Sequence, residues 1–165
     1  MSEMTVIMGV DPGSACTGYG IVKTDGIAVT YVASGVIELA AKTARYQKLC
    51  EIHRGIGEVI REHHPAHFAI EEVFYSRNAK STLTLGEARG AAILAASLCG
   101  LPVYEYSARE VKQSVTGNGA AHKSQVSFML TKLLHLEAAP DAPDESDALA
   151  VAVCHAFKNR EWSAV

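Results

Sequence analysis

The sequence lacks the marks of membrane, secreted and disordered proteins. Its longest apolar stretch, Gly90 to Tyr104, is interrupted by Gly100 and Pro102, whereas a membrane-spanning helix needs about 20 apolar residues. No basic segment followed by an apolar one stands near the N-terminus, so no signal peptide is expected. Hydrophobic residues make up 48% and charged residues 20%, which excludes disorder. We expect a cytoplasmic protein without membrane contact.

Metal-binding and redox spacings are also missing. The four cysteines, Cys16, Cys50, Cys99 and Cys154, each stand alone among apolar residues. They are therefore predicted to be small core residues of a reduced, intracellular protein. The segment HHPAH, residues 63–67, is interpreted as a solvated turn between a helix and a strand rather than as a zinc site.

Positive charge is concentrated in the middle of the chain. The net charge is −3, yet residues 77–132 contain seven Lys or Arg and only three acids. Such a segment can follow a phosphate backbone, although solvated helix faces have the same composition. The basic residues are Arg77, Lys80, Arg89, Arg109, Lys112, Lys123 and Lys132.

The hydrophobic pattern predicts an antiparallel meander followed by alternating helices and strands. Turn signals at Pro-Gly-Ser and Asp25-Gly26 join the first three strands. The predicted order is strands 4–11, 18–24 and 27–38, a helix within 43–64, strand 67–74, helix 82–98, strand 101–106, helices 107–116 and 123–136, and a helix from about Asp144. This order predicts one α/β domain over residues 1–165, with a five-stranded mixed sheet and helices on both faces.

Carboxylates stand at element ends and inside one strand. Asp11 ends the first strand, Glu71 and Glu72 interrupt a later apolar strand, and Asp144 and Asp147 lie one turn apart at the start of the last helix. Taken singly, each has a structural explanation as a turn, solvent-facing or helix-capping residue.

Taken together, these acids predict a metal site. The carboxylates converge if the strands of Asp11 and Glu71 are neighbours and the last helix crosses them. Oxygen ligands suit Mg²⁺ or Mn²⁺, and two such ions can promote phosphodiester hydrolysis. Strand pleating puts Glu71 and Glu72 on opposite faces, so only one can join Asp11, and periodicity leaves open which.

Six stretches in order resemble the RuvC family of Holliday junction resolvases, bacterial endonucleases with a ribonuclease H-like fold. They are GVDPGSACTGYGIV, FAIEEVFYSRNAKS, LGEARGAAILAA, VYEYSAREVKQSVTGNG, HKSQV and DESDALAVAVCH. The resemblance implies that the catalytic and metal-binding acids are Asp11, Glu71, Asp144 and Asp147. It selects Glu71 over Glu72.

The resemblance also implies a DNA-binding surface. Lys112 and Lys123 match basic residues near the scissile phosphate, and Phe74 matches an aromatic that stacks on opened bases. The segment FYSRNAKS adds Tyr75, Arg77 and Lys80, a composition suited to stacking single strands. Arg89 is a further expected DNA contact.

The implied activity is metal-dependent cleavage of a four-way DNA junction by paired nicks. Two Mg²⁺ ions per site are expected, with Mn²⁺ as a substitute, and the products are ligatable 5′-phosphate and 3′-hydroxyl ends. One acidic site cannot reach two strands, so a homodimer is expected. The family further implies work with the RuvA–RuvB branch-migration complex and a preference for short sequences at the cut.

Two other functions compete with this interpretation. The hairpin GVDPGS looks like the phosphate loop of the actin, Hsp70 and sugar-kinase group, but that site needs two such domains. A junction-binding module of the same fold without catalytic activity would require a missing acid, and none of the four is missing.

Overall fold

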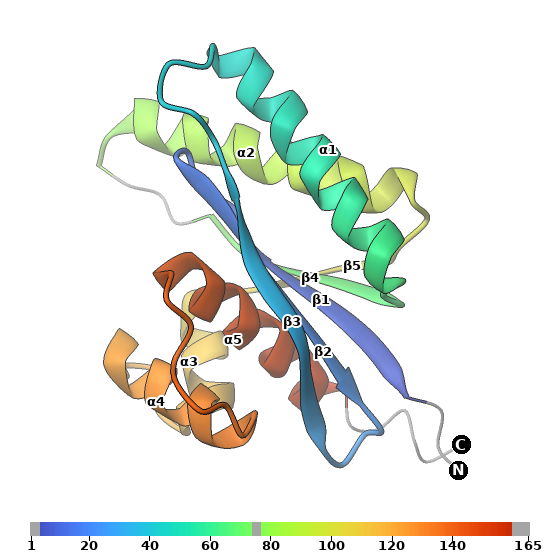
Figure 1. Ribbon diagram of the computed structural model, residues 1–165. Helices are drawn as coiled ribbons and strands as arrows, with labels where there is room; N and C mark the ends of the chain where they lie inside the picture. Colours follow the sequence, from blue (N-terminus) through green and yellow to red (C-terminus); the bar gives the residue numbers. More distant parts are fainter. Residues whose placement is uncertain (1–3, 74–76, 160–165) are drawn as a thin grey trace.

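The computed structural model describes residues 4–73 and 77–159. Its centre is a five-stranded sheet with the order β3-β2-β1-β4-β5 (Figure 1). The strands are β1 (Thr5–Asp11), β2 (Cys16–Thr24), β3 (Val29–Glu38), β4 (His67–Glu71) and β5 (Val103–Tyr106). β1, β2 and β3 form an antiparallel meander, while β4 runs parallel to β1 and to β5. The predicted mixed sheet is confirmed.

Helices cover both faces of this sheet, as predicted. They are α1 (Arg45–His63), α2 (Ala79–Leu98), α3 (Ala108–Thr116), α4 (Lys123–Leu133) and α5 (Pro143–Lys158). Alternate strand residues supply two buried clusters: Met8 packs with α1 and α2, whereas Ile7 packs with α3, α4 and α5. Figure 1 shows the two helical layers separated by the diagonal sheet. Within the described residues, none of the helices combines the length and hydropathy that a membrane span requires.

Glycines let α5 lie unusually close to the sheet. A Cβ atom on Gly18 would stand 2.1 Å from the Asp144 carbonyl oxygen, and one on Gly9 would stand 2.2 Å from the Ala148 carbonyl oxygen. Only glycine leaves room for the helix backbone at these points. Because Gly18 pairs with Asp11 across the β1–β2 ladder, this close approach brings the start of α5 to the end of β1.

Two element boundaries differ from the sequence prediction. β4 ends at Glu71 instead of continuing to residue 74, and the Glu72 amide donates to the Tyr106 carbonyl 2.9 Å away at the end of the β5 pairing. α2 begins at Ala79, three residues earlier than expected, because the Asn78 side chain accepts hydrogen bonds from two amides of the first turn.

The cysteine prediction is only partly right. Cys154 is buried in the core, but Cys50 and Cys99 are exposed on helical surfaces, and Cys16 is half-buried beside Asp144. All four are free thiols, as expected. A small apolar side chain is tolerated at a helix surface, which spacing alone does not reveal.

Candidate active site

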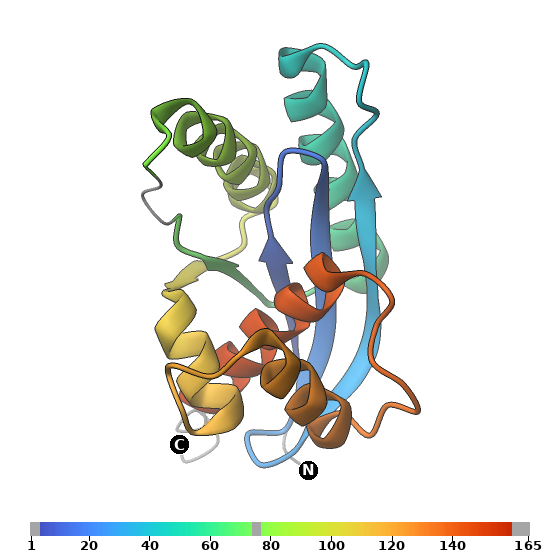
Figure 2. The same ribbon diagram turned by 90° about the vertical axis from the view of Figure 1, so that its left-hand side faces the viewer.

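Three elements bring the predicted acids to one edge of the sheet. Asp11 and Glu71 end the neighbouring parallel strands β1 and β4, so both lie at the same edge. Asp144 and Asp147 occupy the first turns of α5, which crosses that edge. Figure 2 shows α5, in red, lying across the strands on the side opposite α1 and α2.

The acids are close enough to affect each other's ionisation. The pKa of Asp11 is raised to about 8, mainly by burial and also by the negative charges of Asp147, Glu71 and Asp144, while Lys123 opposes them. Burial and Asp147 likewise raise the pKa of Glu71, against the lowering effect of Lys123 and Lys112. Clustered carboxylates of this kind favour a bound cation.

The structure settles which of the two adjacent glutamates faces the acids. Glu71 is half-buried and lines a small cavity of about 150 Å³ with Lys112, Lys123 and Asp147. Glu72 is exposed and does not line that cavity. The pleat therefore directs Glu71 towards the acidic edge and Glu72 away from it.

Two lysines face the acids from helices α3 and α4. The Lys123 ammonium, at the first position of α4, donates to the Asp147 carboxylate at 2.7 Å. That hydrogen bond is the main cause of the raised pKa of Lys123. Lys112 lines the same cavity from α3. A phosphate placed here meets two positive charges next to the carboxylates.

Cys16 contacts the acidic edge, which the sequence interpretation missed. Its thiol donates to the Asp144 carboxylate at 3.1 Å. Burial and this hydrogen bond raise the pKa of the thiol to about 11, so it stays protonated as a donor. The sequence signal for this contact is the place of Cys16 five residues after Asp11, at the start of β2 and directly after a loop of small residues.

Arg89, an expected DNA contact, points inward in this structure. Its side chain is 18% exposed; it pairs with Glu105, and its Nε donates to the Glu71 carbonyl oxygen at 3.2 Å. The guanidinium is thus held between α2, β4 and β5. This geometry favours a role in positioning Glu71 over contact with a backbone phosphate.

The remaining DNA-contact predictions fall in and after the β4–α2 connection. Arg77 and Lys80 are exposed at the start of α2, where a phosphate can reach them. Phe74 and Tyr75 lie outside the described residues.

The donor set suits a hard divalent cation. The four acids offer only carboxylate oxygens, the ligands that Mg²⁺ and Mn²⁺ prefer, and Asp11 is buried among like charges that a cation would neutralise. Within residues 4–73 and 77–159, no group of three or more His, Cys, Asp or Glu side chains is arranged to hold a metal ion, so the acids would have to move closer together to bind one. An open carboxylate set leaves coordination positions for water and phosphate, so the residues fit such an ion.

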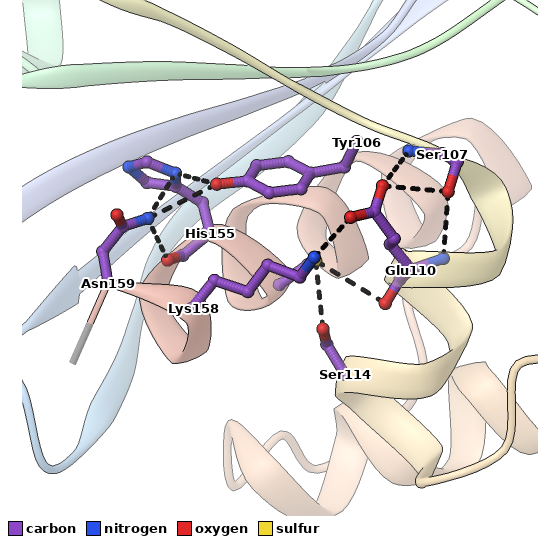
Figure 3. A network of polar contacts seen from close by, with 8 residues as sticks. Tyr106, Ser107, Glu110, Ser114, His155, Lys158 and Asn159 are labelled. Carbon is purple, nitrogen blue, oxygen red and sulfur yellow. Dashed lines mark hydrogen bonds and ion pairs between the residues drawn. The ribbon is translucent and has the colours of Figure 1, made fainter. Parts of the chain in front are cut away.

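His67 is not in a solvated turn, contrary to the interpretation of HHPAH. Its Nδ1 lies 3.1 Å from Nε2 of the fully buried His155 near the end of α5. The other ring nitrogen of His155 lies 2.7 Å from the Tyr106 hydroxyl, and Asn159 closes this network (Figure 3). Burial lowers the pKa of His155 to about 4 and also lowers that of His67, so the pair is neutral and structural.

The sheet order and the acidic edge define a ribonuclease H-like fold with a candidate nuclease site. The model of the family "Crossover junction endodeoxyribonuclease RuvC" matches residues 7–155. The chain therefore belongs to the RuvC family. This membership overturns the phosphate-loop ATPase alternative.

Similar proteins support the same placement. A RuvC from Aliivibrio fischeri is 49% identical over 95% of this chain and 90% of its own length, and one from Shewanella sediminis is 51% identical over 92% and 87%. The solved Thermus thermophilus RuvC in complex with a Holliday junction substrate is 33% identical, with a TM-score of 0.90, covering 96% of this chain and 97% of that one. The yeast mitochondrial resolvase Ydc2, 10% identical with a TM-score of 0.66, shares the fold.

Proposed function

We propose that this chain resolves four-way DNA junctions by metal-dependent hydrolysis of two phosphodiester bonds. The observation that carries the proposal is the meeting of Asp11, Glu71 and Asp147 with Lys123 at one sheet edge in a member of a junction endonuclease family. Each cut joins a water oxygen to phosphorus and breaks the bond to the 3′ oxygen. The products are 5′-phosphate and 3′-hydroxyl ends.

The four acids hold the metal in this proposal. Asp11, Glu71, Asp144 and Asp147 supply the ligands of two Mg²⁺ ions, with Mn²⁺ as a substitute. When bound, the ions activate the attacking water and stabilise the leaving oxygen. Arg89 keeps the end of β4 in place through its bond to the Glu71 carbonyl.

The positive side chains hold the substrate. Lys112 and Lys123 face the acids and bind the scissile phosphate, which competes with Asp147 for the Lys123 ammonium. Arg77 and Lys80 bind the backbone on either side of the cut, and Phe74 and Tyr75 stack on opened bases. These contacts select a junction because its crossover offers bases that unstack easily.

A homodimer through α2 supplies the second active site. Leu83, Leu94 and Leu98 are 64%, 52% and 71% exposed along this helix. Gly86 and Gly90 lie between them, and a Cβ on either would meet nothing within 4 Å. Such an apolar stripe on a helix marks a protein contact. The variant Leu94→Glu tests this interface. We expect it to sediment as a monomer and to nick only one strand of the junction.

The cellular setting follows from the family. We place the dimer in the cytoplasm, acting on junctions delivered by the RuvA–RuvB branch-migration complex. The negative overall charge, −3 per chain, is compatible with DNA binding because the positive side chains gather near the acidic edge.

The decisive experiment compares a synthetic four-way junction with a linear duplex of the same sequence, in Mg²⁺, Mn²⁺ or EDTA. We expect paired symmetric nicks in the junction alone, absent in EDTA. Metal-dependent cutting of both substrates contradicts junction selectivity. Tight junction binding without cutting in either metal identifies a binding module whose acids are structural.

A further inference from the structure

A second cavity lies on the other face of the sheet, near the acidic edge. It measures about 430 Å³ and is bounded by the β1–β2 turn, the loop before α1, and the helices α1 and α2. Figure 2 shows the dark blue β1–β2 turn between these two helices. None of the four acids lines this cavity. Its volume falls within the range of about 300–1,000 Å³ that small-ligand sites occupy.

The walls of the cavity are aliphatic and fixed. Leu39, Ile52 and Ala88 are at most 6% exposed and belong to the core beneath α1 and α2, and Leu49 packs against them. Among residues 4–73 and 77–159, no aromatic side chain lines the cavity. Two aliphatic faces of this kind can enclose a flat ring, and they are already formed by the fold.

The rim of the cavity carries positive charge and hydrogen-bonding groups. The Lys48 ammonium lines it and makes no ion pair with any residue in the described part of the chain. Arg45 pairs with Glu87 through two of its N–H groups, and a guanidinium has five, so three remain for a ligand. The rim therefore suits an anionic ligand with a polar edge.

Gly13 connects the cavity to the acidic edge. It lines the cavity, and a Cβ built on it would stand 3.9 Å from an Asp144 carboxylate oxygen and 2.3 Å from the Cys16 carbonyl. A side chain is therefore excluded, and the backbone alone separates the two sites here. A ligand in the cavity has the acidic edge as its immediate neighbour.

We propose that this cavity binds the base of an unpaired nucleotide adjacent to the phosphate cleaved at the acidic edge. The proposal rests on the proposed function and assigns a subsite to it. The aliphatic walls cover the two faces of the base, Arg45 and Glu87 meet its polar edge, and Lys48 binds the adjoining phosphate. A polypeptide segment fits less well, because the positive rim and the link to the nuclease site favour a nucleotide.

The test combines a blocked cavity with junctions that lack single bases. Ala41 is exposed and lines the cavity, so Ala41→Trp fills its mouth from a loop. The matched control is Ala40→Trp, because Ala40 is also exposed but lines a different cavity. Junction affinity is measured in EDTA, with an abasic nucleotide placed in turn at each position around the cut.

We expect one abasic position to weaken binding by about tenfold for the unaltered protein and for Ala40→Trp. Ala41→Trp should bind the intact junction about tenfold more weakly than the unaltered protein does. Its affinity should not fall further when the junction carries the abasic nucleotide at that position. Should a melting curve show that Ala41→Trp is unfolded, Thr84→Trp fills the cavity from α2 instead.

Two results overturn the proposal. The first is that the abasic nucleotide lowers the junction affinity of Ala41→Trp as much as that of the unaltered protein, which means that another site holds that base. The second is the absence of any sensitive position in the unaltered protein. Cleavage of the intact junction in Mg²⁺ by the same preparation is scored separately, and its absence counts against the proposed function instead.

Discussion

The two ends of α5 place polar groups in opposite electrostatic situations. At its start, Asp11, Glu71 and Asp147 share one edge, where Lys123 donates a hydrogen bond to Asp147 and its charge lowers the pKa values of the other two. Near its end, His155 has both ring nitrogens paired, one with the Tyr106 hydroxyl and one with His67. Figure 3 shows His155 with Tyr106 and Asn159, and the neighbouring ion pair of Glu110 with Lys158.

The difference separates a binding role from a structural one. Polar groups that only stabilise a fold are satisfied within it, as at the His155 end. The acidic end instead retains like charges in a partly buried place, which lowers stability until a cation binds. One buried helix joins the two, since its middle turns from Ala148 to Val153 are fully or almost fully buried.

The largest effect is expected from removing the repulsion at the acidic end. Asp11→Asn keeps the shape of the side chain but removes a ligand charge. Cleavage should fall at least about hundredfold while junction binding persists. The unfolding temperature in EDTA should rise because burial and the neighbouring carboxylates disfavour an ionised Asp11, whereas Asn has no charge to bury. Melting curves with and without Mg²⁺ check this, since Mg²⁺ should stabilise the variant less than the original.

The control for this prediction is the exposed neighbour of Glu71. Glu72→Gln also removes one negative charge from this part of the chain but leaves the acidic edge unchanged. Normal cleavage is expected. A variant Asp11→Asn that loses junction binding while remaining folded would contradict the metal-ligand role.

The next largest effect should come from separating α5 from the sheet. Gly18→Ala places a Cβ where the Asp144 carbonyl now stands, so the start of the helix must move. Overpacking typically costs about 1–3 kcal/mol of unfolding free energy, and cleavage should fall with it. Gly57→Ala on α1 is the control, because a Cβ there would stand 3.4 Å from the flexible end of the Arg61 side chain, in ordinary contact. Unchanged cleavage by Gly18→Ala would show that activity does not depend on the observed position of Asp144.

Disrupting the hydrogen-bond network around His155 should alter the free energy of unfolding and its pH dependence without altering metal binding. His155→Leu removes one buried hydrogen-bond partner of His67 and one of Tyr106, at a cost of about 1–3 kcal/mol at pH 7.5. The folded pKa of His155 is about 4, and the unfolded value is about 6.5. Between these values the unfolded chain binds a proton that the folded chain does not, so stability falls as the pH is lowered.

Denaturant titrations across this window measure the effect. The stability gap between the original protein and His155→Leu should narrow as the pH falls from 6.5 towards 4, because the variant has no imidazole to protonate at that position. His53→Leu on α1 is the matched control. A constant gap across the window would contradict the buried neutral pair.

The smallest expected effect concerns Lys123, which donates a hydrogen bond to Asp147. Lys123→Ala removes a 76% exposed side chain, so the fold should be unaffected. Turnover should drop by about tenfold, and the slope of log affinity against log salt should decrease by about one. Junction cleavage at several salt concentrations checks both; an unchanged rate at every salt concentration would exclude contact with phosphate.

The sequence by itself determined the sheet, its helices and the acids. Strand alternation and helical spacing show on the chain because each element must bury one face, so five strands and five helices were predictable. The six family motifs identified Asp11, Glu71, Asp144 and Asp147. Element ends were less predictable: β4 stops at Glu71 and α2 starts after Asn78, through hydrogen bonds that periodicity does not encode.

Only the tertiary structure decided which groups meet. Arg89 turned out to hold the Glu71 carbonyl, Cys16 to donate to Asp144, and His67 to pair with His155. Each contact joins residues far apart in the chain, and none has a local pattern. Gly18 set the outcome at the site, because the absence of a side chain lets α5 approach β2 closely enough to carry Asp144 to Asp11. Local sequence preferences determine which helices and strands form, whereas close packing of those elements determines which side chains come into contact.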